Sequence, residues 1–191
     1  FTTNTDAFNV AVGKSAGGAV TTGIQNTIIG ALAGDALTDA DYNVAVGLGA
    51  LSADTLGSKS TAIGTNTLQN QNFTTATDSF NTALGFHAGY AVTTGVQNTL
   101  IGGLAGDAIT VASSNTAIGY QALTADTQGQ NSVAVGHNAL ATQNSTTTSN
   151  IYNVAVGSQA GLVVSTGQQN TIVGALAGDA LETGNNNVII G

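Results

Sequence analysis

A short motif recurs along the chain at a nearly constant interval, and this periodicity constrains the fold more than any other feature. Residues 9–13 (NVAVG) recur as residues 26–30 (NTIIG), and further copies follow up to the last residue. The closing glycines are 17 residues apart, with two intervals of 21, and stand at Gly13, Gly30, Gly47, Gly64, Gly85, Gly102, Gly119, Gly136, Gly157, Gly174 and Gly191. Units this short are stable only when they stack on their neighbours. The pattern therefore predicts a single solenoid over residues 1–191.

A longer repeat of 72 residues is superimposed on the short one. Residues 14–85 recur as residues 86–157 with more than half of the positions identical, and a partial copy occupies residues 158–191. Each full copy contains three coils of 17 residues and one coil of 21. We infer that a block of four coils has been duplicated.

Residue types before each glycine indicate a β-strand; positions are numbered here relative to the closing glycine. Position −1 is always Val, Ile or Leu, position −3 is always Thr or Val, and position −2 is most often Ala. Residues two apart lie on the same face of a strand, and β-branched side chains favour this conformation. We expect positions −1 and −3 to face the core, so that a charge at Ile63 or Ile118 would be buried. An Ala-rich face would then remain on the outside.

Position −4 carries Asn in nine coils and Ser in two. Identical amide side chains on stacked strands can form a hydrogen-bonded ladder. The predicted ladder consists of Asn9, Asn26, Asn43, Ser60, Asn81, Asn98, Asn115, Ser132, Asn153, Asn170 and Asn187.

Two further positions vary in a complementary way. Position +4 is Gly in six coils and Leu in four, whereas position +7 is Val, Leu or Ile after Gly and Asp or Gln after Leu. Each coil thus supplies one large apolar side chain from one position or the other. This pattern is typical of volume compensation in a thin, continuous core.

Turn chemistry separates a solenoid from a series of hairpins. Two-residue hairpins favour Asn-Gly or Asp-Gly, and neither pair occurs in the chain. Glycines recur instead at position −7, where we expect coil corners with positive φ: Gly23, Gly57, Gly95, Gly129, Gly167 and Gly184. The 26 glycines and the period of two argue against helix. The predicted fold is an all-β, parallel β-solenoid of about eleven coils, spaced about 4.8 Å apart.

Composition excludes several classes of function. Only 6% of residues are charged, and ten acidic residues against Lys14 and Lys59 give a net charge of −8. The chain therefore lacks the basic surface that nucleic acids and acidic membranes require. No apolar run approaches the roughly 20 residues that span a bilayer, and the start of the chain does not resemble a signal peptide. The apolar content of 42% argues against intrinsic disorder.

The strand motif resembles the head repeats of YadA-like trimeric autotransporter adhesins. Residues 130–136 (QNSVAVG) carry this resemblance, and residues 115–123 (NTAIGYQAL) are similar to repeats of phage tail-fibre-like proteins. The resemblance covers nearly the whole chain and implies a left-handed β-roll that forms a homotrimer in a surface adhesin or fibre. Coils of 17 and 21 residues are longer than those of the adhesin heads, which are about 14 residues long.

Candidate catalytic and metal sites are weak in this sequence. Residues 13–17 match a Gly-x-Ser-x-Gly elbow, but the equivalent of Ser15 is His87 in the second copy, so we expect a coil corner. Asp39 and Asp41 have the spacing that opens a calcium loop, but the loop lacks its Gly and its final Glu. Asp35 and its equivalents 72 and 144 residues later are expected to cap turns. We predict no enzyme activity, no metal and no cofactor.

Histidines and aromatic residues leave two readings open. His87 and His137 occupy different positions in their coils and are expected at the surface. Position −5, beside the Asn ladder, holds Phe8, Tyr42, Phe80 and Tyr152. Half-exposed rings at this position would either pack over a coil edge or bind sugars.

The two long coils each insert a polar loop, at residues 71–77 and 143–149. Both loops are rich in Thr and contain an Asn-x-Thr sequon, so Asn72 and Asn144 are candidate N-glycosylation sites. The loops are expected to project on the same side, about 19 Å apart. They are either display knobs or neutral products of duplication.

The expected function is that of a structural or adhesive extracellular fibre, on a cell surface or a virion. We expect the partner to be the chain itself, as a homotrimer or an end-to-end filament, because the core is thin and no cap is visible in the sequence. A cell-surface or glycan receptor is a further candidate partner. The alternative functions are an ice-binding or a glycan-binding solenoid. Ice binding would need a flat regular array of Thr, and the Thr/Val position has no second Thr column beside it.

Overall fold

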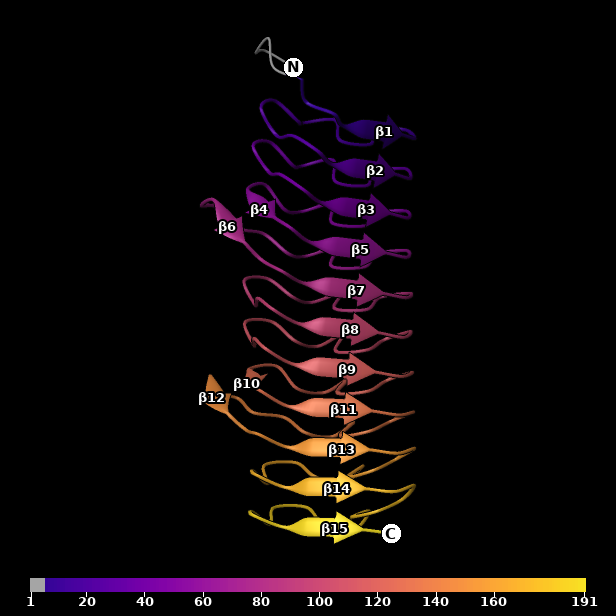
Figure 1. Ribbon diagram of the computed structural model, residues 1–191, viewed down its shortest axis with the longest axis vertical. Coiled ribbons are helices and arrows are strands. Elements are labelled where there is room, and N and C mark those ends of the chain that lie inside the picture. The colour runs from indigo at the N-terminus through magenta and orange to yellow at the C-terminus, as the bar shows by residue number, and fades with distance from the viewer. Residues whose placement is uncertain (1–5) are drawn as a thin grey trace.

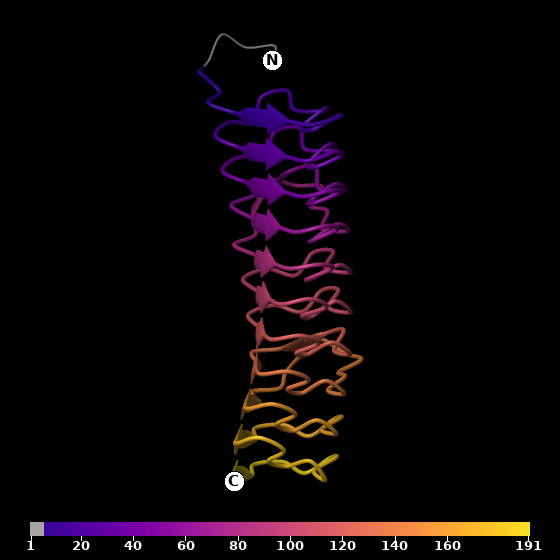
Figure 2. The same ribbon diagram turned by 90° about the vertical axis from the view of Figure 1, so that its right-hand side faces the viewer.

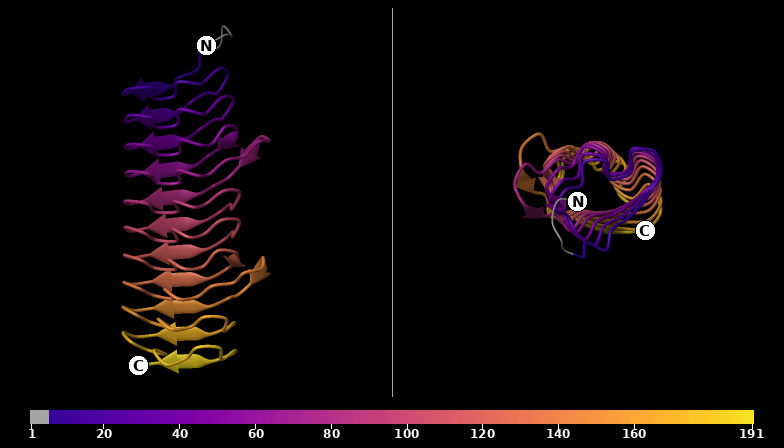
Figure 3. Two further views of the ribbon diagram at one scale, coloured as in Figure 1. Left: turned by 180° about the vertical axis from the view of Figure 1, so that it is seen from behind. Right: turned by 90° about the horizontal axis from the view of Figure 1, so that it is seen from above.

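The computed structural model describes residues 6–191, which form one straight stack of coils (Figure 1). The described residues contain strands, turns and bends but no helix. Seen along the axis, the coils superpose around a common closed outline (Figure 3). The predicted all-β, parallel β-solenoid is confirmed.

Each closing motif forms a three-residue strand, and these strands stack into one parallel sheet of eleven. Neighbouring coils pair in the register that the period predicts, for example Ala117 with Ala134. The strands turn gradually about the axis from one end of the stack to the other (Figure 2). In order, the sheet contains β1 (Val10–Val12), β2 (Thr27–Ile29), β3 (Val44–Val46), β5 (Thr61–Ile63), β7 (Thr82–Leu84), β8 (Thr99–Ile101), β9 (Thr116–Ile118), β11 (Val133–Val135), β13 (Val154–Val156), β14 (Thr171–Val173) and β15 (Val188–Ile190).

Four shorter strands form where each 21-residue coil lies against the 17-residue coil before it. β4 (Gly57–Ser58) pairs with β6 (Thr77–Asp78), and β10 (Gly129–Gln130) pairs with β12 (Ser149–Asn150), both in parallel. The two inserted loops bulge from the same side of the stack, away from the large sheet (Figures 1 and 3). The expected common direction of the loops is therefore observed.

The closing glycine is invariant because no other residue fits. In the described coils that have a following coil, its φ lies between 128° and 139°, outside the regions that residues with a Cβ adopt readily. A Cβ atom at Gly85 would also lie 2.7 Å from the carbonyl carbon and oxygen of Gly102 in the next coil. Both the conformation and the contact repeat along the stack, so each coil approaches the next through a bare backbone.

The glycines at position −7 have a different role from the one expected. None of them has a positive φ, so the predicted left-handed corner is wrong. A Cβ at Gly95 would instead collide with the backbone carbonyl oxygen of Ala112 in the next coil. At Gly57 the collision would be with the side chains of Asp54 and Phe73. These glycines are required by close approach and not by backbone conformation.

The large sheet is oriented opposite to the prediction. Position −2, which is Ala in most coils, is buried: Ala45, Ala62 and Ala117 have no exposed surface. Positions −1 and −3 face outward, and Ile63 is 36% exposed. The expectation that Ile63 and Ile118 are core residues is therefore wrong, as is the idea of an external Ala-rich face. The coil is narrow, so small side chains point inward along the sheet and branched ones point out.

Volume compensation in the core is confirmed and extends to a third position. Leu51 and Leu123 at position +4 are fully buried, as are Leu37 and Ile109 at position +7. The residue at position −2 has a large side chain where the position +4 residues before and after its strand are both glycine. A Cβ at either Gly89 or Gly106 would come within 2.7 Å of the Leu100 side chain. The interior is thus filled by complementary choices at three positions.

Leu100 and Ile101 are adjacent in β8 but face opposite ways, which allows a matched test of the orientation. We expect Leu100→Ala to destabilise the protein by about 2–5 kcal/mol, because it opens a cavity in the core. Ile101→Ala should cost less than about 1 kcal/mol, since that side chain is half-buried on the outer face. Urea denaturation followed by circular dichroism measures both. Equal losses would show that the two faces are not distinguished by burial.

Candidate functional site: the outer face, the aromatic row and the inserted loops

The predicted Asn ladder is present and binds backbone rather than only its own members. Asn98 has no exposed surface. Its backbone N–H donates to Oδ1 of Asn81 (2.9 Å), and its Nδ2 donates to the carbonyl oxygen of Ala112 in the next coil (2.9 Å). Its own Oδ1 accepts from the N–H of Asn115 (3.0 Å). The Asn98 side chain thus satisfies two backbone groups of the following coil, while its own backbone N–H is satisfied by the Asn of the preceding coil, and the ladder is structural.

Serine interrupts the ladder just before each inserted loop, and a buried network replaces the missing amide. Nε2 of Gln71 donates to Oγ of Ser60 (2.8 Å) and to Oδ2 of Asp54 (2.6 Å), while Oε1 of Gln71 accepts from Nδ2 of Asn81 (2.8 Å). Ser60 also bonds to Ser79. All five residues are at most 1% exposed. The Gln and Asp at position +7 are therefore parts of one polar plug, which the sequence did not reveal.

The second copy contains the same plug with one exchange. Nε2 of Gln143 donates to Oδ2 of Asp126 (2.5 Å), and Oε1 of Gln143 accepts from Nδ2 of Asn153 (2.9 Å). The first loop buries Phe73 beside Gly57, where the second has Ser145. The second loop buries Ile151 beside Gly129 instead, at the position of Ser79. One apolar side chain covers the plug in each copy, from alternative positions.

Burial makes Asp54 an unusual carboxylate. Loss of hydration raises its pKa above the usual 3.8, and hydrogen bonds from Gln71 and from the backbone N–H groups of Phe73, Gly57 and Thr55 oppose part of the rise. The folded protein therefore binds this proton more tightly than the unfolded chain does. The contribution of Asp54 to the free energy of unfolding is fully present below pH 3.8 and is lost as the pH rises through the elevated value.

Replacement of Asp54 should therefore change the pH dependence of stability. We expect wild type to gain stability relative to Asp54→Asn as the pH is lowered from neutral toward 3.8, the ordinary pKa of the group. Urea midpoints at several pH values measure the difference. The control is Asp179→Asn, which removes the same charge from an exposed side chain. A difference that is independent of pH would contradict the raised pKa.

The outer face of the large sheet is the most regular surface of the molecule; we define it as positions −3 and −1 of the eleven strands. It carries two parallel columns of side chains, one of Thr or Val and one of Val, Ile or Leu. These side chains are half-buried or exposed along the whole stack, from Val12 (57%) to Ile190 (77%). No charged residue occurs in either column.

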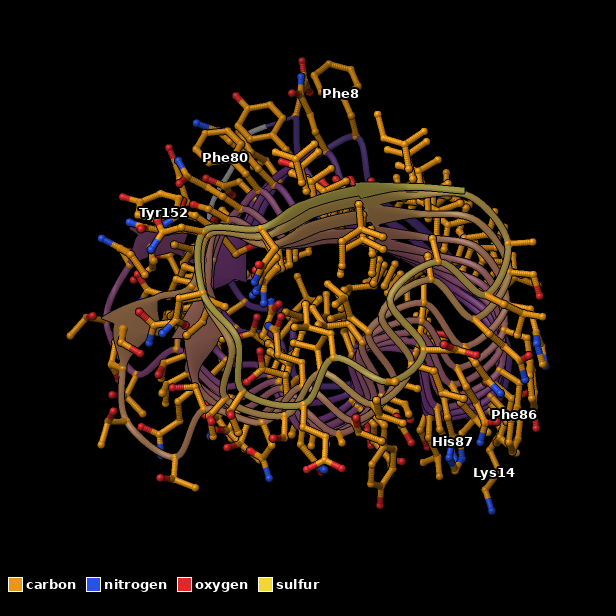
Figure 4. All side chains as sticks on the ribbon, turned by 90° about the horizontal axis from the view of Figure 1, so that it is seen from below. Phe8, Lys14, Phe80, Phe86, His87 and Tyr152 are labelled. Carbon is orange, nitrogen blue, oxygen red and sulfur yellow. The ribbon has the colours of Figure 1, made fainter. Side chains whose placement is uncertain are left out.

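Position −5 lies along one edge of the outer face and forms a second ordered surface. Phe8, Phe80 and Tyr152 project outward from the same side of the stack (Figure 4). Together with Tyr42 they are between 49% and 71% exposed. The expectation that these rings lie at a coil edge beside the ladder is thus met, and Nζ of Lys59 lies over the Phe80 ring, 5.3 Å from its centroid.

The histidines lie near the opposite edge, among other aromatic rings. His87 stacks on Phe86, with ring centroids 3.9 Å apart, and on Tyr90 at 4.7 Å. His137 lies 5.9 Å from Tyr120. In the cross-section the rings of Phe86 and His87 lie on the side of the stack that also carries Lys14, away from Phe80 (Figure 4). The histidines are therefore not brought together.

The inserted loops expose most of their threonines and both of their sequon asparagines. Asn72 and Asn144 are exposed, and Oδ1 of each lies 3.2 Å from the Oγ1 donor of Thr55 or Thr127. Nδ2, the atom that glycosylation would modify, makes none of the hydrogen bonds found for these side chains. A shallow polar hollow beside the second loop is lined by Ser145, Thr147 and Gln168, among others.

The structure does not assemble the other candidate groups into a site. Ser15 is exposed in a turn, with φ of 59°. Oδ1 of Asp39 accepts from Oγ1 of Thr22 (2.5 Å), and Oδ1 of Asp41 accepts from the N–H of Ile24 (2.8 Å), so both carboxylates bond to the preceding coil. Asp107 accepts a hydrogen bond from Thr124. Residues 6–191 contain no cluster of three or more His, Cys, Asp or Glu side chains that could hold a metal ion.

Comparisons of the chain with protein-family models, curated proteins and solved structures give no significant match. Within residues 6–191, no helix is long and apolar enough to cross a membrane. The functional argument therefore rests on the surfaces of the solenoid.

Proposed function

We propose that the protein is a segment of an extracellular structural or adhesive fibre that associates laterally with copies of itself through the outer face. The observation that supports this proposal is the uninterrupted double column of branched side chains on eleven strands. Such a fibre needs a rigid rod with a repetitive contact surface, and it needs no catalytic group. The resemblance to adhesin-head and tail-fibre repeats is consistent with this role and with a location on a cell surface or virion.

The size of the outer face supports association. Eleven strands at about 4.8 Å and three residues at about 3.3 Å give a plan area of roughly 500 Å². The largest apolar patch on a typical monomer covers about 300–600 Å², and such patches often mark interaction sites. Because stable interfaces bury about 800 Å² per partner, we expect association at micromolar concentrations rather than an obligate complex.

A second copy is the partner that fits this face best. The face has the same coil repeat as any copy of the chain, so the ridges of one solenoid can lie between those of another. The face itself carries no charge, so lateral contact through it places no like-charged side chains against each other. The inward Ala column takes no part, because it is buried within the coil.

Charged substitutions on the outer face should abolish association without unfolding the rod. We expect the double variant Ile101→Lys/Ile118→Lys to sediment as an 18.7 kDa monomer at a concentration where wild type is larger. Lysine lowers the net negative charge, so the effect would arise from solvation of the face and not from added repulsion. The control is Thr146→Lys/Thr147→Lys at the exposed loop. A wild-type protein that remains monomeric at high micromolar concentration would exclude lateral self-association.

Ice binding is a second candidate, and one observation favours it. The Thr/Val column and the aliphatic column face outward on the same sheet, in register, over eleven strands. The surface therefore has the regularity that binding to an ice plane requires, although only one column contains Thr. Measurement of thermal hysteresis tests this function. We expect activity, if the candidate is correct, to be lost in Thr99→Lys/Thr116→Lys and kept in Thr146→Lys/Thr147→Lys.

A further inference from the structure

The four aromatic residues at position −5 all lie on alternate coils of the stack. Every second coil carries a ring or a short polar residue, in the order Phe8, Tyr42, Phe80, Ser114, Tyr152 and Asn186. The coils between them carry only amides or lysine, in the order Gln25, Lys59, Gln97, Asn131 and Gln169. The 72-residue duplication relates Phe8, Phe80 and Tyr152 to one another, but it does not account for Tyr42, which is aligned with Ser114. We call this column the aromatic row.

The backbone of the aromatic row is held in a costly conformation. All eleven residues have φ between 49° and 62°, in the left-handed region. Bulky residues are rare there and glycine is favoured, yet glycine never occurs at this position. Strained residues of this kind cost of order 1–3 kcal/mol each and are concentrated at binding and active sites. The same conformation occurs at other coil positions, including the buried Leu51 and Leu123, so here it belongs to the shared geometry of the coils and gives the row a uniform backbone.

Backbone hydrogen bonds fix the spacing of the row. The N–H of Tyr42 donates to the carbonyl oxygen of Ile24 in the preceding coil (3.0 Å), and the N–H of Gln97 donates to that of Ser79 (2.7 Å). Rings two coils apart are therefore separated by about 9.6 Å along the axis, twice the strand spacing. This distance is too long for one ring to stack on the next, since stacked centroids lie about 4.5–7 Å apart. The rings Phe8, Tyr42 and Phe80 thus form separate, evenly spaced platforms.

An extended polysaccharide has the matching periodicity. In a β-1,4-linked chain of pyranoses, equivalent sugars recur at every second unit, at close to the distance between successive rings of the row. The apolar C–H face of a pyranose packs on an aromatic ring, while its hydroxyl groups form hydrogen bonds with amides. The exposed amide of Gln25 stands between the rings of Phe8 and Tyr42, where a hydroxyl of the intervening sugar would lie, and Lys59 stands between Tyr42 and Phe80.

The net charge of the protein favours neutral over acidic polysaccharides. The chain has a net charge of −8, which opposes binding of acidic polymers. Lys59, the only cation in the row, already pairs with Asp78 at 2.6 Å and lies 5.3 Å from the centroid of Phe80. A neutral ligand is therefore favoured.

We propose that the aromatic row binds a neutral, extended β-1,4-linked polysaccharide that runs along the solenoid axis, with one ring under every second sugar. The proposal specifies the adhesive target of the proposed fibre but does not depend on lateral association, since the row lies at the edge of the outer face. Binding of this kind gains strength with ligand length, because each additional pair of sugars reaches a further ring.

Isothermal titration with cellohexaose and chitohexaose, together with affinity electrophoresis in hydroxyethylcellulose, tests the proposal. We expect the hexaoses to bind at least tenfold more tightly than the corresponding disaccharides, which reach one ring only. Tyr42→Ala/Phe80→Ala should lower the affinity at least tenfold. The control Tyr120→Ala removes a ring of similar exposure (50%) outside the row and should change affinity less than twofold.

A variant in which one ring is moved to the neighbouring coil distinguishes the effect of ring spacing on affinity from the effect of ring number. Tyr42→Gln/Lys59→Tyr keeps the number of rings but moves one by a single coil, so we expect at least a fivefold loss of affinity for the hexaoses. Dextran, a neutral polymer without the extended β-1,4 repeat, should cause no retardation. Equal binding by wild type and the row variants, or no binding of either hexaose, would overturn the proposal. Sedimentation of the same variants should match wild type, so failure of this proposal is distinguishable from failure of self-association.

Discussion

Close approach of each coil to the next, around nearly its whole circumference, is the constraint on which the structure depends. Parallel β-bridges hold the strands, and further backbone hydrogen bonds continue through the turns. Side chains cannot occupy the places where backbone lies against backbone. The closing glycines and those at position −7 meet this requirement, the first also through a φ that other residues avoid. The fixed register then stacks identical positions, so any chemical property of one position becomes a continuous column.

The burial of polar side chains is possible because of the same stacking. An amide at position −4 bonds to two backbone groups of the following coil, and its own backbone N–H bonds to the amide of the preceding coil, so the Asn side chains in the interior of the stack are buried without unsatisfied groups. Where the insertion of four residues displaces the backbone, Ser replaces Asn, and Gln71 or Gln143 supplies the amide from another position. The inserted loops are therefore tied into the core through Asp54, Phe73 and Ile151, while their threonine-rich tips remain exposed.

Two ordered surfaces result, and they differ in chemistry. The outer face has no charge and no ring, and its regular branched side chains suit another flat, regular surface. The aromatic row combines rings with amides and suits a ligand that is apolar on one face and rich in hydroxyls at its edges. Both surfaces run the length of the rod, so both would bind extended partners and gain from many weak contacts.

Sequence alone determined the repeat, the parallel solenoid, the Asn ladder and the complementary volumes at positions +4 and +7, because each depends on spacing or on residue size along the chain. It did not determine which face of the strand is inside. A period of two shows that positions −1 and −3 share a face but not where that face points, and hydrophobicity favoured the wrong side. The Asn ladder indicated the buried face, because residues two apart lie on the same face of a strand. Asn98 at position −4 must be buried to bond to both neighbouring coils, and Leu100 at position −2 lies on the same face. Only the tertiary structure decided which face is buried. The narrow closed coil has room mainly for small side chains on the inner face of the sheet, so the branched side chains lie on the outer face.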